Sequence, residues 1–346
     1  MKKILSLFGC TILSMNTQVN ADLAQVTDQQ LSDYTAAGLG FAIENFVLNS
    51  DSAVLKVTGI NNAAGTEVPI NWSELYIMGE GSQKGTVTTP TSIGSYLNPW
   101  AVRSVLGSAD WDGNPATHHS GDYAAIGNDI ALLEFATAQY DSSIQNTKQY
   151  VQSCIMAYDP SCVTKTSLRR AGMDIGSKFE LLLPGGSDYL DIDMMGVFVD
   201  GSSLRLWSRA ENGAPSELLG QLNINFFAKQ IDIGVCQSVC NESLSTLKIS
   251  NLFLDLNIGY GEIQPLVLNA TSDGNFELEL RKPNPGPQGV NQNNSNSMIA
   301  FYNDYYSNVP KSNVYIGNVQ VGNNTVGEQS IRDLSIQYMK FTSQDL

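Results

Sequence analysis

One spacing of apolar residues recurs along the chain and constrains its fold more than any other feature. An apolar residue stands at positions i, i+3 and i+5 in five segments, which begin at Ile43, Met194, Ile249, Ile316 and Ile331. Strict alternation on a β-strand would place apolar residues at every second position, so each segment breaks that alternation once. A β-bulge, or a strand that passes between buried and half-buried surroundings, would produce such a break. The copies are irregularly spaced, unlike the fixed period of a β-solenoid.

Short runs rich in β-branched and aromatic residues, separated by Gly, Asn, Asp and Ser, are typical of strands and turns. Two Asp-Gly pairs, at Asp200 and Asp273, stand between apolar runs and suit the positive φ of a hairpin turn. The sequence therefore predicts a mainly β fold, a two-sheet antiparallel sandwich of the jelly-roll kind, with a β-solenoid as the alternative. The clearest strand runs are Phe41 to Leu48, Ala53 to Ile60, Glu74 to Met78 and Ile130 to Ala136.

Helices are predicted in three short stretches. Residues 28–36 follow a capping box formed by Thr27 and Gln30. Residues 142–158 lack Gly and Pro and carry apolar side chains at helical intervals. Residues 298–306 contain a local aromatic cluster whose helical spacing predicts one packed face. The β-rich domain is therefore expected to contain one or two short helices, after a helical tail.

The amino-terminal segment has the features of a secretory signal peptide. Two lysines precede an apolar stretch of about twelve residues, and Val19 and Ala21 fit a small-residue cleavage site. The sequence therefore predicts export through the Sec pathway to the periplasm, the outer-membrane surface or the extracellular space. The predicted organisation is a signal peptide at 1–21, an N-terminal helical tail at 22–40 and a single β-rich domain at 41–346.

Four of the five cysteines remain after the predicted cleavage, and an even number in an exported chain favours disulfides. Their spacing favours two local bridges, Cys154 with Cys162 and Cys236 with Cys240. A tetrahedral zinc site is the alternative, but neither pair has the usual C-x-x-C spacing, and an oxidising compartment disfavours free thiolates. The fifth cysteine, Cys10, would carry a lipid if the signal were of the lipoprotein type.

The charge of the chain limits its partners. It has 34 acidic and 19 basic residues, which give a formal net charge of −15. This argues against nucleic acid, because binding to phosphates needs a basic surface. No segment after the signal has the roughly eighteen consecutive apolar residues of a membrane-spanning helix. The chain is therefore not predicted to be an integral membrane protein.

A calcium loop is the only cofactor site that the sequence suggests. Asp110, Asp112 and Asn114 place oxygen ligands at alternate positions, and Asp122 follows closely. An EF-hand loop would have Glu at its twelfth position, where Gly121 stands. These residues could hold calcium, and the alternative is an ordinary solvated turn, which uses the same residue types.

The sequence contains no clear catalytic constellation. The two histidines, His118 and His119, are adjacent, so on a strand they would face opposite sides, and no Gly-x-Ser-x-Gly elbow accompanies them. Asp191 and Asp193 look like part of the strand motif of laminarinase-like glycosidases, which are two-sheet jelly rolls. Tyr189 stands where that motif has its nucleophilic Glu, and a retaining glycosidase needs two carboxylates. We therefore predict that the protein is not an enzyme, with a secreted glycosidase as the lesser alternative.

Three stretches resemble a group of exported proteins of Gram-negative bacteria, some of which are described as pilus-assembly or fil-cluster proteins. The stretches are Val26 to Phe41, Pro69 to Gly79 and Ser330 to Leu346. The resemblance implies a surface or pilus-associated structural or assembly protein. Its expected partners are other surface or pilus proteins or further copies of itself. A carbohydrate-binding or calcium-dependent adhesin with a jelly-roll fold is the second hypothesis.

Overall fold

A computed structural model describes residues 38–50, 53–82, 88–96, 98–107, 126, 130–138, 171–209, 217–237, 246–271, 273–283 and 290–343. The chain divides into two compact units, Met1–Ala37 and Gly38–Leu346, and all described residues belong to the second. Within them the predicted mainly β fold is confirmed, and all strand pairings are antiparallel. This pattern differs from the parallel coils of a β-solenoid.

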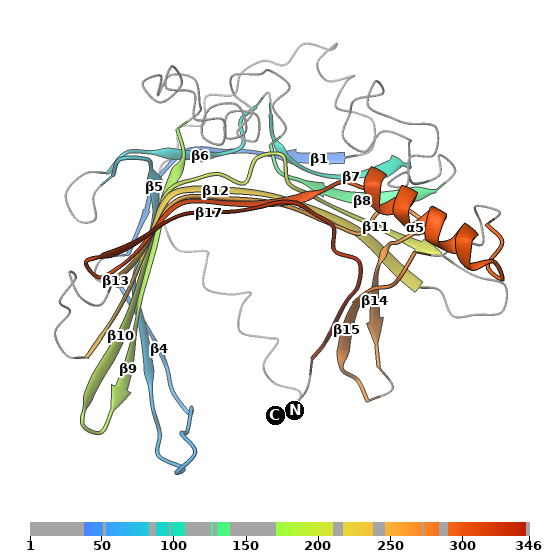
Figure 1. Cartoon of the computed structure of the whole chain (residues 1–346). Helices are drawn as coiled ribbons and strands as arrows, with labels where there is room; N and C mark the ends of the chain where they lie inside the picture. The colour runs from blue at the N-terminus through green and yellow to red at the C-terminus, as the bar shows by residue number, and fades with distance from the viewer. Residues whose placement is uncertain are drawn as a thin grey trace. The chain divides into compact units, whose positions relative to one another are not determined.

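The described residues contain eighteen strands and one helix (Figure 1). The predicted strand runs contain β2, β4 and β8 and the second half of β5. In chain order the elements are β1 (Gly38–Phe41), β2 (Ile43–Phe46), β3 (Leu48–Asn49), β4 (Val54–Val57), β5 (Ile70–Gly79), β6 (Thr91–Ile93), β7 (Trp100–Leu106), β8 (Ala131–Ala136), β9 (Met173–Leu183), β10 (Gly186–Val197), β11 (Ser203–Arg209), β12 (Glu217–Gln237), β13 (Thr246–Ile258), β14 (Leu266–Ala270), β15 (Phe276–Leu280), α5 (Ser295–Asn308), β16 (Ser312–Val321), β17 (Asn324–Leu334) and β18 (Met339–Thr342).

Strand β12 is the spine of a 16-stranded sheet, while β2 and β6 pair only with each other. One edge of β12 pairs with β11 along its first part and with β10 along its last part; the other edge pairs with β14 and then β13. From there, β13 continues to β16 and β17, and β14 continues to β15 and β18. The arrangement is consistent with the predicted sandwich, although its strands form one branched sheet and not two separately bonded ones.

The Asp200-Gly201 pair does not form the predicted hairpin. Strands β10 and β11, on either side of it, both run antiparallel to the 21-residue strand β12 and pair with successive parts of it. Strands β10 and β11 therefore run in the same direction, and the residues between them interrupt the strand only locally. Hydrogen bonds from two other segments fix this interruption. Gly201 has a φ of 79°, its N–H donates to the Ala138 carbonyl, and its carbonyl accepts from the Asn225 amide. The dipeptide predicted the local backbone conformation correctly but not the strand pairing.

The second Asp-Gly pair forms the predicted hairpin. It joins β14 to β15, which pair antiparallel over their whole length. Gly274 has a φ of 82°, and its N–H donates to the Thr271 carbonyl over 2.9 Å. The Thr271 N–H in turn donates to the Asn275 carbonyl over 2.8 Å, which closes the loop. Here the turn residues predicted the pairing correctly, because β14 and β15 pair directly with each other and no third strand pairs with both of them.

The predicted helix at residues 298–306 is confirmed as the centre of α5. The Asn294 side chain caps its amino terminus by accepting from two backbone N–H groups. The expected packed face is present, since Phe301 and Tyr305 are buried and stack with their ring centroids 5.6 Å apart. They pack against Tyr260, which follows β13. The other two predicted helices, at 28–36 and 142–158, lie outside the described residues.

In four of the five segments the recurring apolar spacing coincides with a shift in pairing register, as a β-bulge produces, while the segment that begins at Ile249 keeps its register with both neighbours. Four of the five segments have a left-handed residue at position i+2, where Asn, Asp and Gly are best tolerated. The fifth, which begins at Ile316, has a shift in pairing register between Ile316 and Val319. The left-handed residues are Asn45, Gly196, Asn251 and Asp333, with φ of 56°, 61°, 52° and 56°.

Several of these irregular positions line up across neighbouring strands. A Cβ added to Gly196 of β10 would lie 3.0 Å from the Cβ of Lys229 in β12. Lys229 and Asn251 stand at the same level of β12 and β13, and a Cβ added to Gly317 of β16 would lie 3.1 Å from that of Asn251. We call these four residues the bulge row. Bulges bend the strands that carry them, and Figure 1 shows the long strands of the sheet bending along their length.

Candidate interaction surface

One face of the 16-stranded sheet is apolar on both sides of the bulge row. Residues directly opposite each other in an antiparallel pair project to the same face, so the pairing register identifies its members. Three rows of cross-strand neighbours define this apolar face. They are Ile192, Ile233, Leu247 and Val321; Phe226, Leu254, Val314 and Ile331; and Ile258, Leu222, Leu204, Phe135, Val102 and Leu39.

The bulge row keeps these rows on one face. Along β12, the apolar residues of this face occupy even positions up to Ala228 and odd positions from Ile231 onward, whereas Leu219 and Phe227 belong to the opposite face. Phe226 and Ile233, from the two sides of the row, pack against the same cluster of Ala228, Ile231 and Val197. Strands β12, β13 and β16 keep one pairing register across the bulge row, so they change parity together at this level and their apolar residues stay on one face. This is the physical meaning of the spacing i, i+3 and i+5: one residue before the bulge and two after it share a face.

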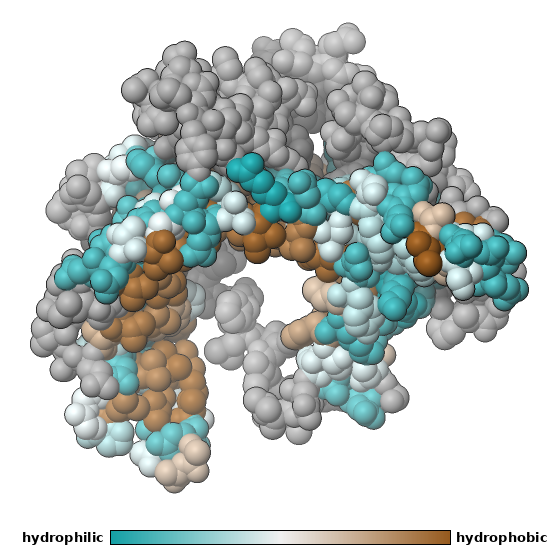
Figure 2. All heavy atoms as spheres, viewed as in Figure 1, coloured by the Kyte–Doolittle hydropathy of each residue, from teal (hydrophilic) through white to brown (hydrophobic). Residues whose placement is uncertain are grey.

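The apolar face is only half-buried. Leu39 is 68% exposed, Val321 52% and Ile331 53%. Figure 2 shows hydrophobic side chains gathered along the inner side of the bent sheet. Contiguous apolar patches of more than a few hundred Å² are rare on monomeric proteins unless they bind a partner. The apolar face is therefore the candidate interaction surface of the described residues.

The opposite face of the sheet, which we call the polar face, buries a row of polar side chains beside two apolar clusters. Gln221, Asn223 and Asn225 alternate along β12 and are 2%, 7% and 6% exposed. The Asn225 amide donates to Asn223, whose own amide donates to Asn257 of β13 over 2.9 Å. The Asn257 amide donates in turn to the Lys311 carbonyl over 2.8 Å. The same face carries the buried aromatic cluster of Phe198, Phe227, Phe253 and Tyr315, so amides and aromatic rings are buried together on it.

A buried carboxylate lies between two arginines on this polar face. Glu134 of β8 is 2% exposed and stands directly between Arg103 of β7 and Arg205 of β11. Each guanidinium Nε lies 2.6 Å from one carboxylate oxygen. Burial alone would raise the pKa of Glu134, but the two arginines, Arg205 foremost, hold that pKa below its ordinary value. The carboxylate stays ionised and ties the three strands together.

The carboxylates of the glycosidase hypothesis project from β10 on the same face. The Tyr76 hydroxyl donates to Asp193 over 2.7 Å, and the Tyr189 hydroxyl donates to Glu180 over 3.0 Å. Burial, and then the hydrogen bond to Asp193, raise the pKa of Tyr76 well above its usual range, so it remains a donor. Asp191 and Lys178 are cross-strand neighbours. Asp193 is thus hydrogen-bonded to β5, across the intervening β9, and Tyr189 to the adjacent β9.

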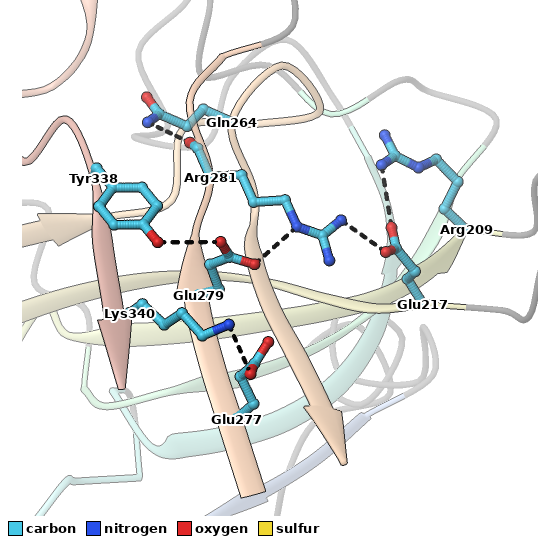
Figure 3. Close-up of polar contacts among 8 residues, drawn as sticks. All are labelled: Arg209, Glu217, Gln264, Glu277, Glu279, Arg281, Tyr338 and Lys340. Atoms are coloured by element: carbon cyan, nitrogen blue, oxygen red, sulfur yellow. Dashed lines mark hydrogen bonds and ion pairs between the residues drawn. The ribbon is translucent and has the colours of Figure 1, made fainter. Parts of the chain in front are cut away.

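An ion-pair network, shown in Figure 3, ties the β14–β15–β18 branch to the spine. Arg281 lies between two carboxylates, with its Nη1 2.7 Å from Glu217 and its Nε 3.1 Å from Glu279. Arg209 pairs with the second oxygen of Glu217, and the hydrogen bond from Arg281 is the first reason why the pKa of Glu217 is lowered. Lys340 of β18 pairs with Glu277 over 2.9 Å. The network was not predicted from the sequence, although the alternating charges of β15 are a signal for it.

The predicted calcium ligands lie outside the described residues, as do the two histidines. The structure therefore leaves the calcium site a prediction. In the part of the chain that the structure describes, no three His, Cys, Asp or Glu residues gather in a way that could hold a metal ion. The residues concerned are Asp110, Asp112, Asn114, His118, His119 and Asp122.

The four predicted disulfide cysteines are mostly outside the described residues as well. Cys236, near the end of β12, is disulfide-bonded, but its partner is not among the described residues. Cys154, Cys162 and Cys240 fall in the segments that are not described. The pairings of Cys154 with Cys162 and of Cys236 with Cys240 therefore stay predictions.

Comparison with family models, curated proteins and solved structures finds no match for this chain. Among the described residues, the single helix is too short and too polar to cross a membrane. The apolar face is consequently the feature on which an argument about function can be built. The recurring spacing is visible in the sequence but the face is not, because the spacing gives no information about which strands are neighbours.

Proposed function

We propose that this chain is an exported structural or assembly protein without catalytic activity, which associates through its apolar face with another surface or pilus protein. The half-exposed apolar face is the observation that carries the proposal. Covering that face would remove a large apolar area from water, which is the dominant favourable term in protein association. The signal-like amino terminus and the resemblance to pilus-assembly proteins support the same role.

The proposal is tested with one residue on the apolar face and its neighbour on the other face. Val321→Glu places a charge among apolar side chains, whereas Gln320→Glu adds the same charge on the polar face. Gentle fractionation of cells that export the full chain should recover it in a complex larger than the monomer. Val321→Glu should release the monomer and Gln320→Glu should not. Recovery of the unaltered chain solely as a free monomer would overturn the proposal.

A further inference from the structure

Strand β17 forms a long edge of the sheet. Within the described residues it pairs with β16 along one side and with no strand along the other. It spans eleven residues, ten of them exposed, while the edge strands β1 and β18 have four residues each. The outer N–H and C=O groups of such a strand are a template for pairing with another strand.

The sequence of β17 is complementary to itself when read in the opposite direction. If Ser330 is placed opposite Ser330 of a second antiparallel copy, Glu328 falls opposite Arg332. The same register places Val326 opposite Leu334. Each of these pairs occurs twice, once on each side of the centre. Opposite charges and apolar pairs directly across from each other both stabilise antiparallel strands.

The charges in β17 favour this register. A shift by one residue in one direction would place Glu328 opposite Asp333, and two like charges directly opposite are destabilising. A shift in the other direction would place Glu328 opposite Ile331 and so lose both ion pairs. Within the chain, the ion pairs of the described residues include neither Glu328 nor Arg332. Both side chains are exposed, and they share one face because both are separated from Ser330 by two residues. They are available to a second copy.

We propose that β17 pairs antiparallel with β17 of a second copy of this chain, about a two-fold axis that passes beside Ser330. A two-fold axis makes each copy present the same strand, so the interface is closed and self-complementary. Ile331 projects onto the apolar face, so the pairing also joins the apolar faces of the two copies. The inference builds on the proposed assembly role, but it uses the edge of the sheet and not its face.

Cysteine cross-linking tests the register directly. Side chains directly opposite in an antiparallel pair have Cβ atoms close enough for a disulfide. Under mild oxidation, Ser330→Cys should form a covalent dimer, and Gln329→Cys alone should do so much more slowly. A mixture of Gln329→Cys with Ile331→Cys should form the mixed dimer, because those positions oppose each other. A Ser330→Cys chain that cross-links no faster than Gln329→Cys would overturn the inference.

Charge reversal provides an independent test that does not depend on a cysteine. Arg332→Glu should raise the dissociation constant of the dimer by roughly tenfold or more, as measured by sedimentation equilibrium. Combining it with Glu328→Arg should restore association, which a variant that merely fails to fold would not do. A double variant whose dimer dissociates as readily as that of the single variant would contradict the pairing.

The same experiments separate this inference from the proposed function. Val321 is on the apolar face and away from the two-fold centre, since it pairs with Asn324 at the first residue of β17. If Val321→Glu leaves a large complex intact while Arg332→Glu dissociates it, the edge pairing stands and the role of the face fails. If instead Val321→Glu dissociates the complex while Arg332→Glu leaves it intact, the edge pairing is wrong and the role of the apolar face stands.

Discussion

The hydroxyl of Tyr76 in β5 donates a hydrogen bond to the carboxylate of Asp193 in β10 across the strand between them, β9. Gly176 of β9 lies under this contact, and a Cβ added there would overlap both the ring and the carboxylate. A hydrogen bond between two strands that are not adjacent requires a residue without a side chain in the middle strand. Three residues that are far apart in sequence thus depend on one another.

Gly176→Ala should therefore destabilise the fold. The added methyl group must displace the Tyr76 ring or Asp193, and overpacking of this kind costs about 1–3 kcal/mol. The matched control is Gly185→Ala, in the turn between β9 and β10, where an added Cβ meets nothing within 4 Å. Urea denaturation of both variants provides the measurement. Equal midpoints would show that the contact over Gly176 is not tight.

Tyr76→Phe should lower the free energy of unfolding by about 1–2 kcal/mol, because Asp193 loses its hydroxyl donor. The pKa of Tyr76 is raised in the folded state, so the stabilisation is complete below the unfolded pKa of about 10 and is lost as pH rises toward the folded value. The difference in stability between the two proteins should stay constant near neutral pH and shrink above about pH 10. A difference that changes between pH 6 and 8, roughly the range where Tyr does not titrate, would argue against this origin.

Glu134→Gln should destabilise the protein by about 3 kcal/mol, since two arginines would lose their buried counter-charge. The pKa of Glu134 is lowered on folding, so its contribution is present above the unfolded pKa of about 4.3 and disappears as pH falls through the folded value. Glu217→Gln is the comparison, at less than about 1 kcal/mol, because Glu217 is more exposed. Chemical denaturation at several pH values measures both. Equal effects of the two substitutions would refute the special role of burial.

Asn251→Val should destabilise the sheet by about 1–2 kcal/mol, because a β-branched residue is strained at a φ of 52°. Asn251→Gly should be tolerated, since glycine adopts the left-handed conformation freely. Thermal unfolding of the two variants gives the comparison. If valine and glycine have the same effect, the left-handed conformation is not what position 251 requires.

The calcium hypothesis predicts a rise in melting temperature when calcium is added to chain that has been treated with a chelator. The rise should vanish in a variant that combines Asp110→Asn with Asp112→Asn, because the loop would lose two anionic ligands. Differential scanning fluorimetry, with magnesium as the control ion, is sufficient. No shift with calcium would leave the loop as an ordinary turn.

Local features of this fold were predictable from sequence, whereas strand pairings were not, apart from the hairpin of β14 and β15. The left-handed positions at Gly196 and Asn251 follow from a spacing visible within six residues, and so does the aromatic face of α5. The turn at Asp200 was also correct as local geometry, yet it failed as a hairpin because the length of β12 decided which strands are neighbours. Backbone conformation is set by adjacent residues, whereas neighbours in a sheet are chosen by the whole chain.

The candidate surface shows the same division. Arg103, Glu134 and Arg205 form one contact, but 31 and 71 residues separate the two arginines from Glu134, and each is an ordinary exposed residue type. The apolar face likewise becomes visible only when the pairing register is known. The apolar positions within each strand can be read from the sequence. Which of them lie together on one surface depends on how the strands are paired.

The bulge row also limits how the sheet can change. Because four neighbouring strands each have their irregular residue at one level, none of them can slide past the next by a single position without losing its place in the row. A deletion of Asn251 would turn half of β13 inside out, moving Leu247 to the polar face where Lys248 now lies. Single-residue insertions or deletions should therefore be tolerated in the loops but not on either side of Asn251.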